Sequence, residues 1–258
     1  MTTSIQSLRP EEILFVDIET VSSKRHLHEL DEEWQALWLE KSRYMRERRQ
    51  ITPEESYEEA GIYAEFGRVI CISVGYFAND PAEESTFRVT SYYGDDEKKV
   101  LIAFAQLLEQ RHEKPFRMMC AHNGKEFDYP YLCRRMIVHG LTLPNLLDMA
   151  GKKPWENLHL DTMELWKFGD YKHFSSLRLL AKLFDIPTPK DDIDGSMVRN
   201  VYYEDDDLNR IEQYCKKDVV TVARVLVHFK ALGPLPDHRI HWVEGQRFDA
   251  APNEHSHV

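Results

Sequence analysis

Four acidic residues and one tyrosine lie in segments whose patterns predict at least partial burial: Asp17, Glu19, Asp128, Tyr214 and Asp218. A buried carboxylate without a partner is unfavourable, so such groups are normally ion-paired or bound to a metal. If the four carboxylates converge, they form an oxygen-only site of the kind that Mg²⁺ or Mn²⁺ prefers. We therefore expect one divalent-metal site, built from residues that are far apart in the sequence.

Asp17 and Glu19 lie two residues apart in the segment 12–19, which we predict to be a strand. The segment is apolar on both faces, as in the central strands of buried sheets. Side chains two residues apart point to the same face of a strand, and two like charges there repel each other unless a cation bridges them. The alternative is that the polar end of the strand simply emerges into solvent.

Asp128 opens a predicted helix over 128–139 and has Pro130 in its first turn. Taken alone, it is better explained as a helix cap or as a first-turn acid that the helix dipole favours. Asn123-Gly124, just before it, is typical of a turn. Only its combination with the other acids makes Asp128 a candidate ligand.

Asp218 interrupts the apolar stripe of a predicted helix over 205–230, where Cys215 precedes it and Val222 follows it at helical spacing. Tyr214 lies one turn earlier, so its hydroxyl can reach the same place. The alternative, which we leave open, is a buried aspartate paired with Lys216, Lys217 or an arginine.

These residues are positioned by an alternation of strands and helices. We predict strands over 12–19, 68–77, 86–93, 116–121 and 158–161, and helices over 96–110, 128–139, 176–184 and 205–230. Asn79-Asp80-Pro81 predicts a turn that joins the second and third strands as a hairpin, and 187–203 is expected to be a loop. The pattern predicts an α/β fold with a mixed five-stranded sheet flanked by helices.

Two segments fall outside this alternation. Residues 24–63 form an expected helical insertion, with Thr52 as an N-cap and Pro53 as the first helical residue. Its Trp34, Trp38 and Tyr44 either pack the insertion onto the core or stack on bases. We expect one domain over 1–233 and a polar tail over 234–258, peripheral or disordered, whose histidines (238, 241, 255 and 257) are too irregularly spaced for a metal site.

The composition is that of a soluble globular protein, with 42% hydrophobic and 30% charged residues in a chain of 258. No apolar run approaches the roughly 20 residues that span a bilayer, the N-terminus lacks signal-peptide features, and no Cys-x-x-Cys pair occurs, so we expect a cytoplasmic protein without a membrane partner. The net charge of −11 argues against a broad basic surface for nucleic acid. Bound divalent ions nevertheless reverse the local field of a carboxylate site.

Three segments resemble, in order, the three motifs of DEDD-type 3′–5′ exonucleases of the ribonuclease H-like superfamily: Phe-Val-Asp-Ile-Glu-Thr at 15–20, Asn-Gly-Lys-Glu-Phe-Asp-Tyr-Pro-Tyr-Leu at 123–132, and Tyr-Cys-Lys-Lys-Asp-Val at 214–219. Tyrosine four residues before the last aspartate is similar to the tyrosine branch (DEDDy); the histidine branch would carry histidine where this chain has Gln213. Within the branch, the chain most resembles stand-alone PolB-like exonucleases, which are similar to the proofreading domain of family B DNA polymerases. The segment 190–196 and the strand 68–75 add to this likeness.

The resemblance implies a ribonuclease H-like fold and a role for each motif residue. Asp17, Glu19 and Asp218 would bind a first ion, and Asp17 would share a second with Asp128. Tyr214 would orient the attacking water. Substrate contacts would come from three residues that match motif positions: Thr20, Asn123 and Phe127.

A further substrate contact is predicted from the residues themselves. Lys172, His173, Ser175 and Ser176 precede the predicted helix 176–184 and would meet a phosphate through side chains and helix-end N–H groups. The alternative is an ordinary helix cap by Ser175 or Ser176.

The expected activity is 3′–5′ exonucleolytic hydrolysis of single-stranded DNA, with release of nucleoside 5′-monophosphates. Two Mg²⁺ or Mn²⁺ ions would activate the water and stabilise the leaving oxygen. An exoribonuclease that acts on RNA 3′ ends is the alternative within the same class, because recognition of the 2′-hydroxyl depends on pocket detail. A catalytically silent nucleic-acid-binding module is disfavoured, since all five motif residues are present.

Overall fold

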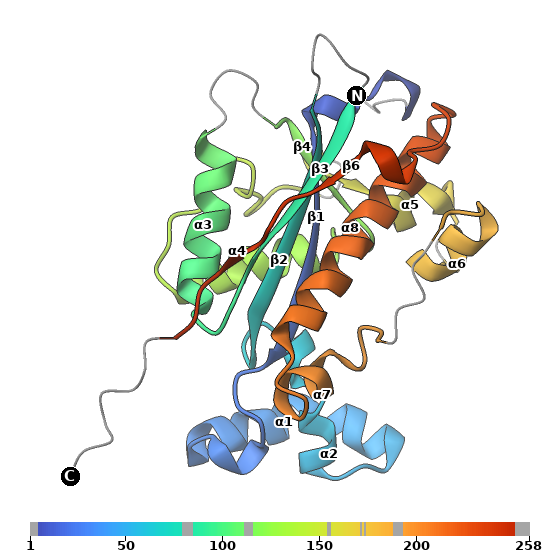
Figure 1. The fold of residues 1–258 in the computed structure, drawn as a ribbon. Coiled ribbons are helices and arrows are strands. Elements are labelled where there is room, and N and C mark those ends of the chain that lie inside the picture. Colours follow the sequence, from blue (N-terminus) through green and yellow to red (C-terminus); the bar gives the residue numbers. More distant parts are fainter. Residues whose placement is uncertain are drawn as a thin grey trace.

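One mixed sheet forms the centre of the molecule (Figure 1). The computed structural model describes residues 5–78, 85–110, 116–153, 156–170, 172, 174–187 and 193–250. Within these ranges the strand order is β5-β4-β1-β2-β3-β6, and β7 also pairs with β3. The strands are β1 (Ile13–Ser22), β2 (Gly67–Ala78), β3 (Thr86–Tyr93), β4 (Met118–Ala121), β5 (Leu160–Asp161), β6 (Ile240–Trp242) and β7 (Gln246–Arg247).

Helices cover both faces of the sheet. The described residues include α1 (Glu32–Arg49), α2 (Pro53–Tyr57), α3 (Glu97–Gln110), α4 (Asp128–Val138), α5 (Thr162–Lys167), α6 (Leu177–Leu183), α7 (Val198–Tyr203) and α8 (Leu208–Phe229). Side chains of α3 and α4 pack on one face and those of α8 on the other. Figure 1 shows α1, α2 and α7 gathered at one end of the molecule, where β1 ends.

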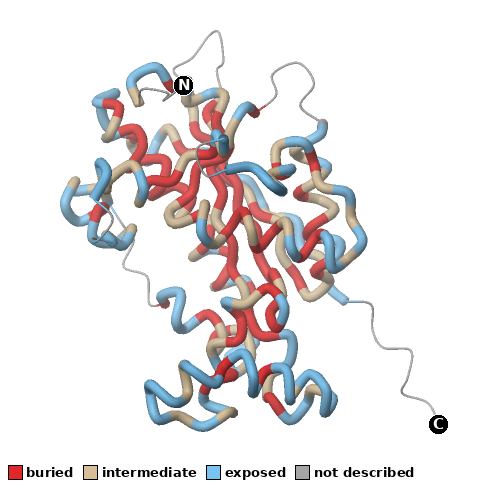
Figure 2. Tube along the Cα trace, turned by 180° about the vertical axis from the view of Figure 1, so that it is seen from behind, coloured by how far each residue is buried: buried red, intermediate tan, exposed pale blue. Residues whose placement is uncertain are grey.

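β1 is the central strand that the apolar run predicts, and its residues alternate between the two cores. Leu14 and Val16 pack with α3 and α4, whereas Ile13 and Phe15 pack with α8. Figure 2 shows the resulting band of buried residues along the middle of the sheet. Because side chains two apart share a face, Asp17 follows Ile13 and Phe15 toward α8.

The predicted mixed sheet is confirmed, and so is the antiparallel pairing of β2 with β3; the turn predicted at Asn79-Asp80-Pro81 lies outside the described residues. Among the described residues the sheet has seven strands rather than the predicted five. The additional β6 and β7 come from the tail and lie parallel to β3, where they pair the backbone groups that an edge strand would otherwise leave open. Two short polar strands give almost no periodic signal, which is why the count was wrong.

The tail therefore lies at the periphery of the sheet as far as residue 250, and His255 and His257 lie outside the described residues. The domain boundary placed at residue 233 stays a prediction. All four cysteines are free. Within the part of the chain that the structure describes, each helix is too short or too polar to cross a membrane.

The loop predicted over 187–203 is wrong in its second half, which forms α7. Asp194 accepts hydrogen bonds from the backbone N–H and the hydroxyl of Ser196, and α7 follows this turn. Val198 and Val201 of α7 are buried in a cluster with residues of β1, β2 and α8. Tertiary packing thus makes a helix of only six residues that propensity alone does not predict.

The predicted insertion contains α1 and α2 and has a small core of its own. Thr52 and Glu55 form a reciprocal capping box at the start of α2, as the Thr-Pro sequence predicts. Trp38 is fully buried, packs edge-on against Tyr57 and Phe66, and donates a hydrogen bond to Ser56. The packing alternative is therefore correct for Trp38, while Tyr44 is exposed.

Candidate metal-binding site

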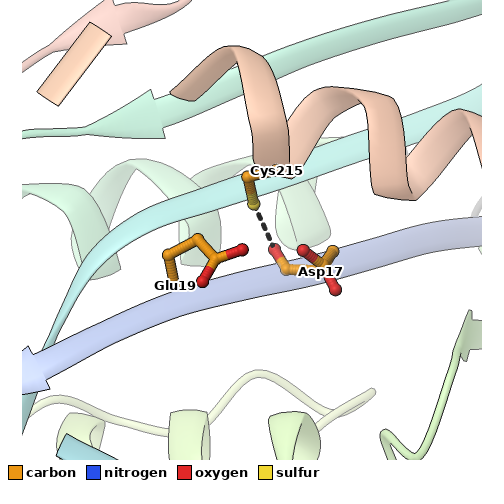
Figure 3. Close-up of side chains that lie close together, drawn as sticks. All are labelled: Asp17, Glu19 and Cys215. Carbon is orange, nitrogen blue, oxygen red and sulfur yellow. Dashed lines mark hydrogen bonds between the residues drawn. The ribbon is translucent and has the colours of Figure 1, made fainter. Parts of the chain in front are cut away.

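The two acids of β1 meet α8 at the middle of the sheet. Asp17 and Glu19 offer carboxylate oxygens, and Cys215 of α8 offers its sulfur, such that the three atoms lie within 4.8 Å of one another. Figure 3 shows the three side chains side by side between the strand and the helix. Glu19 is only 8% exposed, so the alternative in which this end of the strand emerges into solvent does not hold for Glu19.

Asp128 reaches the same region from the start of α4. Its Oδ1 accepts a hydrogen bond of 3.2 Å from the backbone N–H of Ile18, in β1 between Asp17 and Glu19. The N-cap position of α4 is Phe127, which makes no side-chain cap. The carboxylate of Asp128 is therefore hydrogen-bonded to β1. The N-cap interpretation is incorrect, whereas Asp128 does lie in the first turn of α4, as the alternative interpretation predicts.

Asp218 and Tyr214 complete the cluster from α8. The hydroxyl of Tyr214 is hydrogen-bonded with the Asp218 carboxylate. The charge of Asp218 acts on both Asp17 and Glu19. Lys216, one of the partners considered for a buried Asp218, instead pairs with Glu212 at 2.7 Å. The five predicted catalytic residues thus lie in one electrostatically coupled group.

Burial and mutual repulsion disfavour the ionised form of the carboxyl groups in this cluster. Burial, followed by the charges of Asp218 and Asp128, raises the pKa of Asp17 well above its ordinary value. Burial, followed by the charges of Asp17 and Asp218, does the same to the pKa of Glu19. Burial raises the pKa of Asp128 to about 7, although two backbone N–H groups partly oppose the shift. A cation would remove each of these penalties.

The donor set fits a hard divalent cation. Asp17 Oδ2 is buried and has no hydrogen-bond partner, which is an unfavourable state for a carboxylate oxygen unless a cation meets it. Apart from the Cys215 sulfur, the other ligands on offer are carboxylates from β1, α4 and α8, and oxygen donors are what Mg²⁺ and Mn²⁺ select. This unsatisfied oxygen is the observation that most directly indicates a metal site.

Tyr214 is held in its neutral form. Burial, and after it the charges of Asp218 and Glu19, raises the pKa of its phenol far above the ordinary value. The hydroxyl therefore donates or accepts hydrogen bonds near neutral pH and does not act as a base.

A second aspartate, Asp161, shapes the loop before Asp128 and was not predicted to matter. Its carboxylate accepts hydrogen bonds from the backbone N–H groups of Asn123, Lys125, Met163 and Glu164. Asn123 itself has a φ of 66°, which asparagine tolerates better than most residues, so the turn role is correct for it. The sequence Asp161-Thr-Met-Glu164 was the available signal, because it has the spacing of a helix N-cap.

A cleft of about 440 Å³ opens beside Glu19. Thr20 and Phe127, two of the predicted substrate residues, line it. The insertion supplies Glu58, Glu59, Gly61 and Ile62, and the segment around the start of α7 supplies Gly195, Ser196 and Arg199. Thr20 donates a hydrogen bond of 2.9 Å to the carbonyl of Gly61, which ties the insertion to β1.

The other two predicted substrate residues are not part of the described lining of this cleft. Asn123 lies in the turn described above, and the carbonyl of Ser175 is hydrogen-bonded with His122 Nε2 at 2.9 Å. Ser176 caps α6 by accepting from the Leu179 N–H, so the helix-cap alternative is correct for that residue. His173 and residues 188–192 lie outside the described residues.

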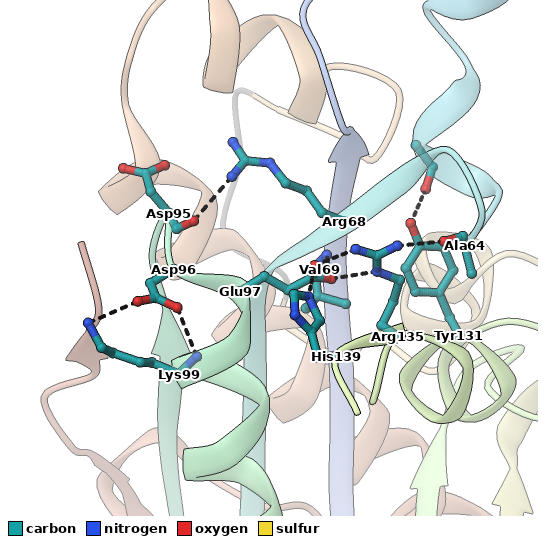
Figure 4. A network of polar contacts seen from close by, with 11 residues as sticks. Ala64, Arg68, Val69, Asp95, Asp96, Glu97, Lys99, Tyr131, Arg135 and His139 are labelled. Carbon is teal, nitrogen blue, oxygen red and sulfur yellow. Dashed lines mark hydrogen bonds and ion pairs between the residues drawn. The ribbon is translucent and has the colours of Figure 1, made fainter. Parts of the chain in front are cut away.

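Glu97, at the start of α3, is a buried carboxylate of the opposite kind (Figure 4). It accepts hydrogen bonds from Arg135, His139 and the Val69 N–H. Burial alone would raise the pKa of Glu97, but the bonds and charge of Arg135 more than offset it and lower that pKa. Glu97 thus links α3 and α4 to β2, and its carboxylate oxygens are occupied by these hydrogen bonds rather than being available to a metal ion.

Comparison with known proteins places these observations in a family. Residues 62–234 match the sequence profile of a family described as "predicted 3′–5′ exonuclease related to the exonuclease domain of PolB". The matched range contains Asp128, Tyr214 and Asp218. The matched range begins after β1 and therefore does not contain Asp17 and Glu19. These two acids are associated with the matched residues by their position in the folded structure.

One solved structure with a similar fold is the family B DNA polymerase of the hyperthermophilic archaeon Pyrobaculum calidifontis. The TM-score is 0.54 at 13% sequence identity, over 84% of this chain and 24% of the polymerase chain. The chain thus spans about a quarter of that protein's length, and the likeness concerns the fold alone. No curated protein matches the sequence.

Proposed function

The chain belongs to the family of predicted 3′–5′ exonucleases related to the exonuclease domain of PolB, and from this premise we propose that it removes nucleotides from the 3′ end of single-stranded DNA. The reaction depends on Mg²⁺ or Mn²⁺ and releases nucleoside 5′-monophosphates. The observation that carries the proposal is the group of buried carboxylates with raised pKa values, one of which has an oxygen without a partner.

Each carboxylate has a place in the proposed site. Asp17, Glu19 and Asp218 would hold one ion, and Asp17 would share a second with Asp128. When bound, two such ions supply an activated water and neutralise the charge on the leaving 3′ oxygen. The hydrogen bond of Asp128 to β1 fixes the start of α4 beside the other ligands, which is the kind of support a preorganised site needs.

Tyr214 orients the water that attacks phosphorus. Its hydroxyl hydrogen is directed to Asp218, so an oxygen lone pair is free to accept a hydrogen bond from the water and direct it. The water oxygen forms a bond to phosphorus while the bond to the 3′ oxygen breaks; the water gives up a proton to solvent, and the 3′ oxygen takes one up from solvent. The products are a nucleoside 5′-monophosphate and a strand shortened by one nucleotide with a new 3′-hydroxyl.

The cleft beside Glu19 supports a single-stranded substrate. The terminal nucleotide would enter this cleft, which is lined by Phe127 and by residues of the insertion. A base that is still paired cannot enter such a space without first leaving its duplex. The insertion thus acquires a role as a wall of the substrate cleft.

The experiment that tests the function is cleavage of a 5′-labelled DNA oligonucleotide. We expect a ladder of products that shorten one nucleotide at a time with Mn²⁺ and none with chelator. The double variant Asp17→Asn with Asp218→Asn should be inactive. Asp206→Asn, the same charge change at an exposed position of left-handed backbone, should be fully active. Metal-dependent cleavage by the double variant would overturn the proposal.

The role of Tyr214 has its own test. Tyr214→Phe removes the hydroxyl that positions the water, so kcat should fall about 10- to 100-fold. The affinity for Mn²⁺, measured calorimetrically, should stay unchanged because the four carboxylates remain. A loss of metal affinity equal to the loss of kcat would assign Tyr214 to metal binding instead.

The same assay distinguishes the RNA alternative. Matched DNA and RNA oligonucleotides would be compared by kcat/KM, since only the 2′-hydroxyl differs. Faster hydrolysis of the RNA would make the protein an exoribonuclease with the same site. Binding of oligonucleotide without hydrolysis of either, in a protein that binds Mn²⁺, would make it a silent module.

A further inference from the structure

The proposed reaction makes no use of a thiol that lies among its carboxylates. Cys215 sits on α8 between Tyr214 and Asp218, and its side chain is fully buried. Its sulfur is within 4.8 Å of a carboxylate oxygen of Asp17 and of Glu19. The thiol donates a weak hydrogen bond, 3.4 Å long, to the backbone carbonyl of Asp17, and it also interacts with the thiol of Cys71. Sulfur is therefore available at a site otherwise made of oxygen.

A second observation indicates that this corner of the site takes a ligand. Asp17 Oδ2 is buried without a hydrogen-bond partner, and the adjacent Glu19 carboxylate is almost fully removed from solvent. Figure 3 shows both acids next to Cys215. Two carboxylates and one thiol thus lie close together, and they form a set of ligands for a cation.

Ion chemistry separates the cations that use this set. Mg²⁺ takes oxygen ligands and has no use for the sulfur. Zn²⁺ binds thiolate sulfur and carboxylate oxygen together, and soft ligands select such ions in general. We propose that Asp17, Glu19 and Cys215 form a binding site for a thiophilic divalent cation such as Zn²⁺ or Cd²⁺, which competes with the Mg²⁺ or Mn²⁺ of the exonuclease.

The binding step is a proton exchange. The incoming ion forms a bond to the Cys215 sulfur as the S–H bond breaks, and the thiol proton passes to the buffer. The weak contact to the Asp17 carbonyl is lost in the same step. Because Asp17 and Glu19 serve both ions, a thiophilic cation held there leaves the hard ion without two of its ligands. Cys215 thus makes the enzyme sensitive to inhibition by zinc.

Cadmium is the probe for the test, because its bond to thiolate has an ultraviolet charge-transfer absorbance that its bonds to oxygen lack. We expect wild-type protein to develop this absorbance up to one equivalent of Cd²⁺. Cys215→Ser should lose it and bind Cd²⁺ at least about tenfold more weakly. Cys133→Ser is the matched control, because Cys133 lies on α4 and its thiol contacts Leu147, and it should behave as wild type.

Competition gives a second readout that needs no substrate. Protein loaded with Mn²⁺ should release it, seen as the free-ion signal in electron paramagnetic resonance, when Cd²⁺ is added in stoichiometric amount. Cys215→Ser should retain its Mn²⁺ under the same conditions, which also shows that the variant is folded. Release from both proteins at the same Cd²⁺ concentration would overturn the proposal.

A measurement on the wild-type protein tests the inference even if the Cys215→Ser variant does not fold. Cadmium NMR of the wild-type complex should show the shift of an ion with a thiolate ligand, and a shift typical of oxygen ligands alone would overturn the inference. The binding tests are independent of catalysis. A protein that binds Cd²⁺ through Cys215 but cleaves no DNA would refute the proposed function only, and an active nuclease without a sulfur-bound ion would refute this inference only.

Discussion

Glu97 is a buried carboxylate, and Asp17 is a partly buried one with a buried oxygen; the two lie at the same sheet in opposite surroundings. Glu97 accepts hydrogen bonds from Arg135, His139 and a backbone N–H, and its pKa is lowered. Asp17 lies among other acids, has one oxygen without a partner, and has a raised pKa, chiefly from burial. The charge of Glu97 is compensated by Arg135, whereas the charges around Asp17 repel one another.

The difference teaches that buried charge has two distinct uses in one molecule. A paired carboxylate such as Glu97 links secondary-structure elements, and removing it leaves the charge of its partner buried without compensation. Acids that repel one another, such as Asp17 and Glu19, are expected to weaken the metal-free fold and to be useful for what they bind. The two regions should therefore respond in opposite ways to substitution, to metal and to pH.

Asp17→Asn should have the largest effect of the four, and it should lower activity without lowering the stability of the metal-free protein. Loss of a ligand should reduce the cleavage rate on the order of a thousandfold or more, about 4 kcal/mol of transition-state stabilisation. Without metal, the variant should be more stable than wild type by about 1 kcal/mol or more, because a buried, repelled charge is gone. Urea unfolding in chelator measures the second quantity. A variant that is less stable than wild type there would show that Asp17 is a structural acid like Glu97.

Glu97→Gln should show the opposite pattern. It strands the buried Arg135 guanidinium, so the free energy of unfolding should fall by about 3 kcal/mol. Equilibrium urea unfolding checks this, with Glu109→Gln, an exposed acid on the same helix, as the control that should change little. Once folded, Glu97→Gln should bind Mn²⁺ like wild type. A stability loss no larger than that of Glu109→Gln would remove the contrast between the two regions.

Manganese should stabilise the protein through the acid group only. At a free concentration one hundred times the Kd, binding to the native state adds about 2.7 kcal/mol to the free energy of unfolding. Thermal unfolding should show this gain in wild type and in Glu97→Gln, and little of it in Asp17→Asn. An equal gain in all three proteins would place the ion elsewhere.

The pH dependence of stability should have opposite signs in the two regions, with the smallest effect of the four. The pKa of Asp128 is raised to about 7 from an ordinary 3.8, so in chelator its contribution to stability is present at low pH and is lost as pH rises between these values. Glu97 has a lowered pKa, so its contribution is present above the ordinary pKa of 4.5 and is lost as pH falls below it.

His159 also makes the stability of the protein depend on pH. Burial lowers the pKa of His159 to about 4, so its contribution to the free energy of unfolding is lost as pH falls from 6.5 toward 4. The difference in the free energy of unfolding between wild type and Asp128→Asn removes the contribution of His159, because both proteins contain it. We expect wild type to lose stability relative to Asp128→Asn as pH rises from 4 to 7. Parallel curves over that interval would show that Asp128 is not strained by its surroundings.

Local pattern predicted the elements that carry the acids. An apolar run with Asp17 and Glu19 identified β1 as central, and Asp218 stood out because it interrupts an apolar helix face. Asp128 could not be recognised alone, because its role depends on a hydrogen bond to Ile18, 110 residues away. The sequence motifs grouped acids whose charges act on one another in the structure, since family likeness encodes long-range contacts that spacing does not.

The parts that were not predicted depend on tertiary contacts. α7 forms because Val198 and Val201 find a buried cluster, and β6 and β7 form because β3 offers an open edge. The place of Cys215 was missed for a similar reason: a cysteine in an apolar stripe is ordinarily a small buried hydrophobe. Its nearness to Asp17 and Glu19 exists only in three dimensions.

Diffraction from crystals soaked in Mn²⁺ tests the central claim most directly, because the anomalous signal locates the ion without reference to activity. We predict manganese peaks between the carboxylates of Asp17, Glu19, Asp128 and Asp218, and their loss in Asp17→Asn. A wild-type crystal with no manganese at these carboxylates, in a protein that cleaves DNA with Mn²⁺, would contradict the claim that this acid group is the metal site.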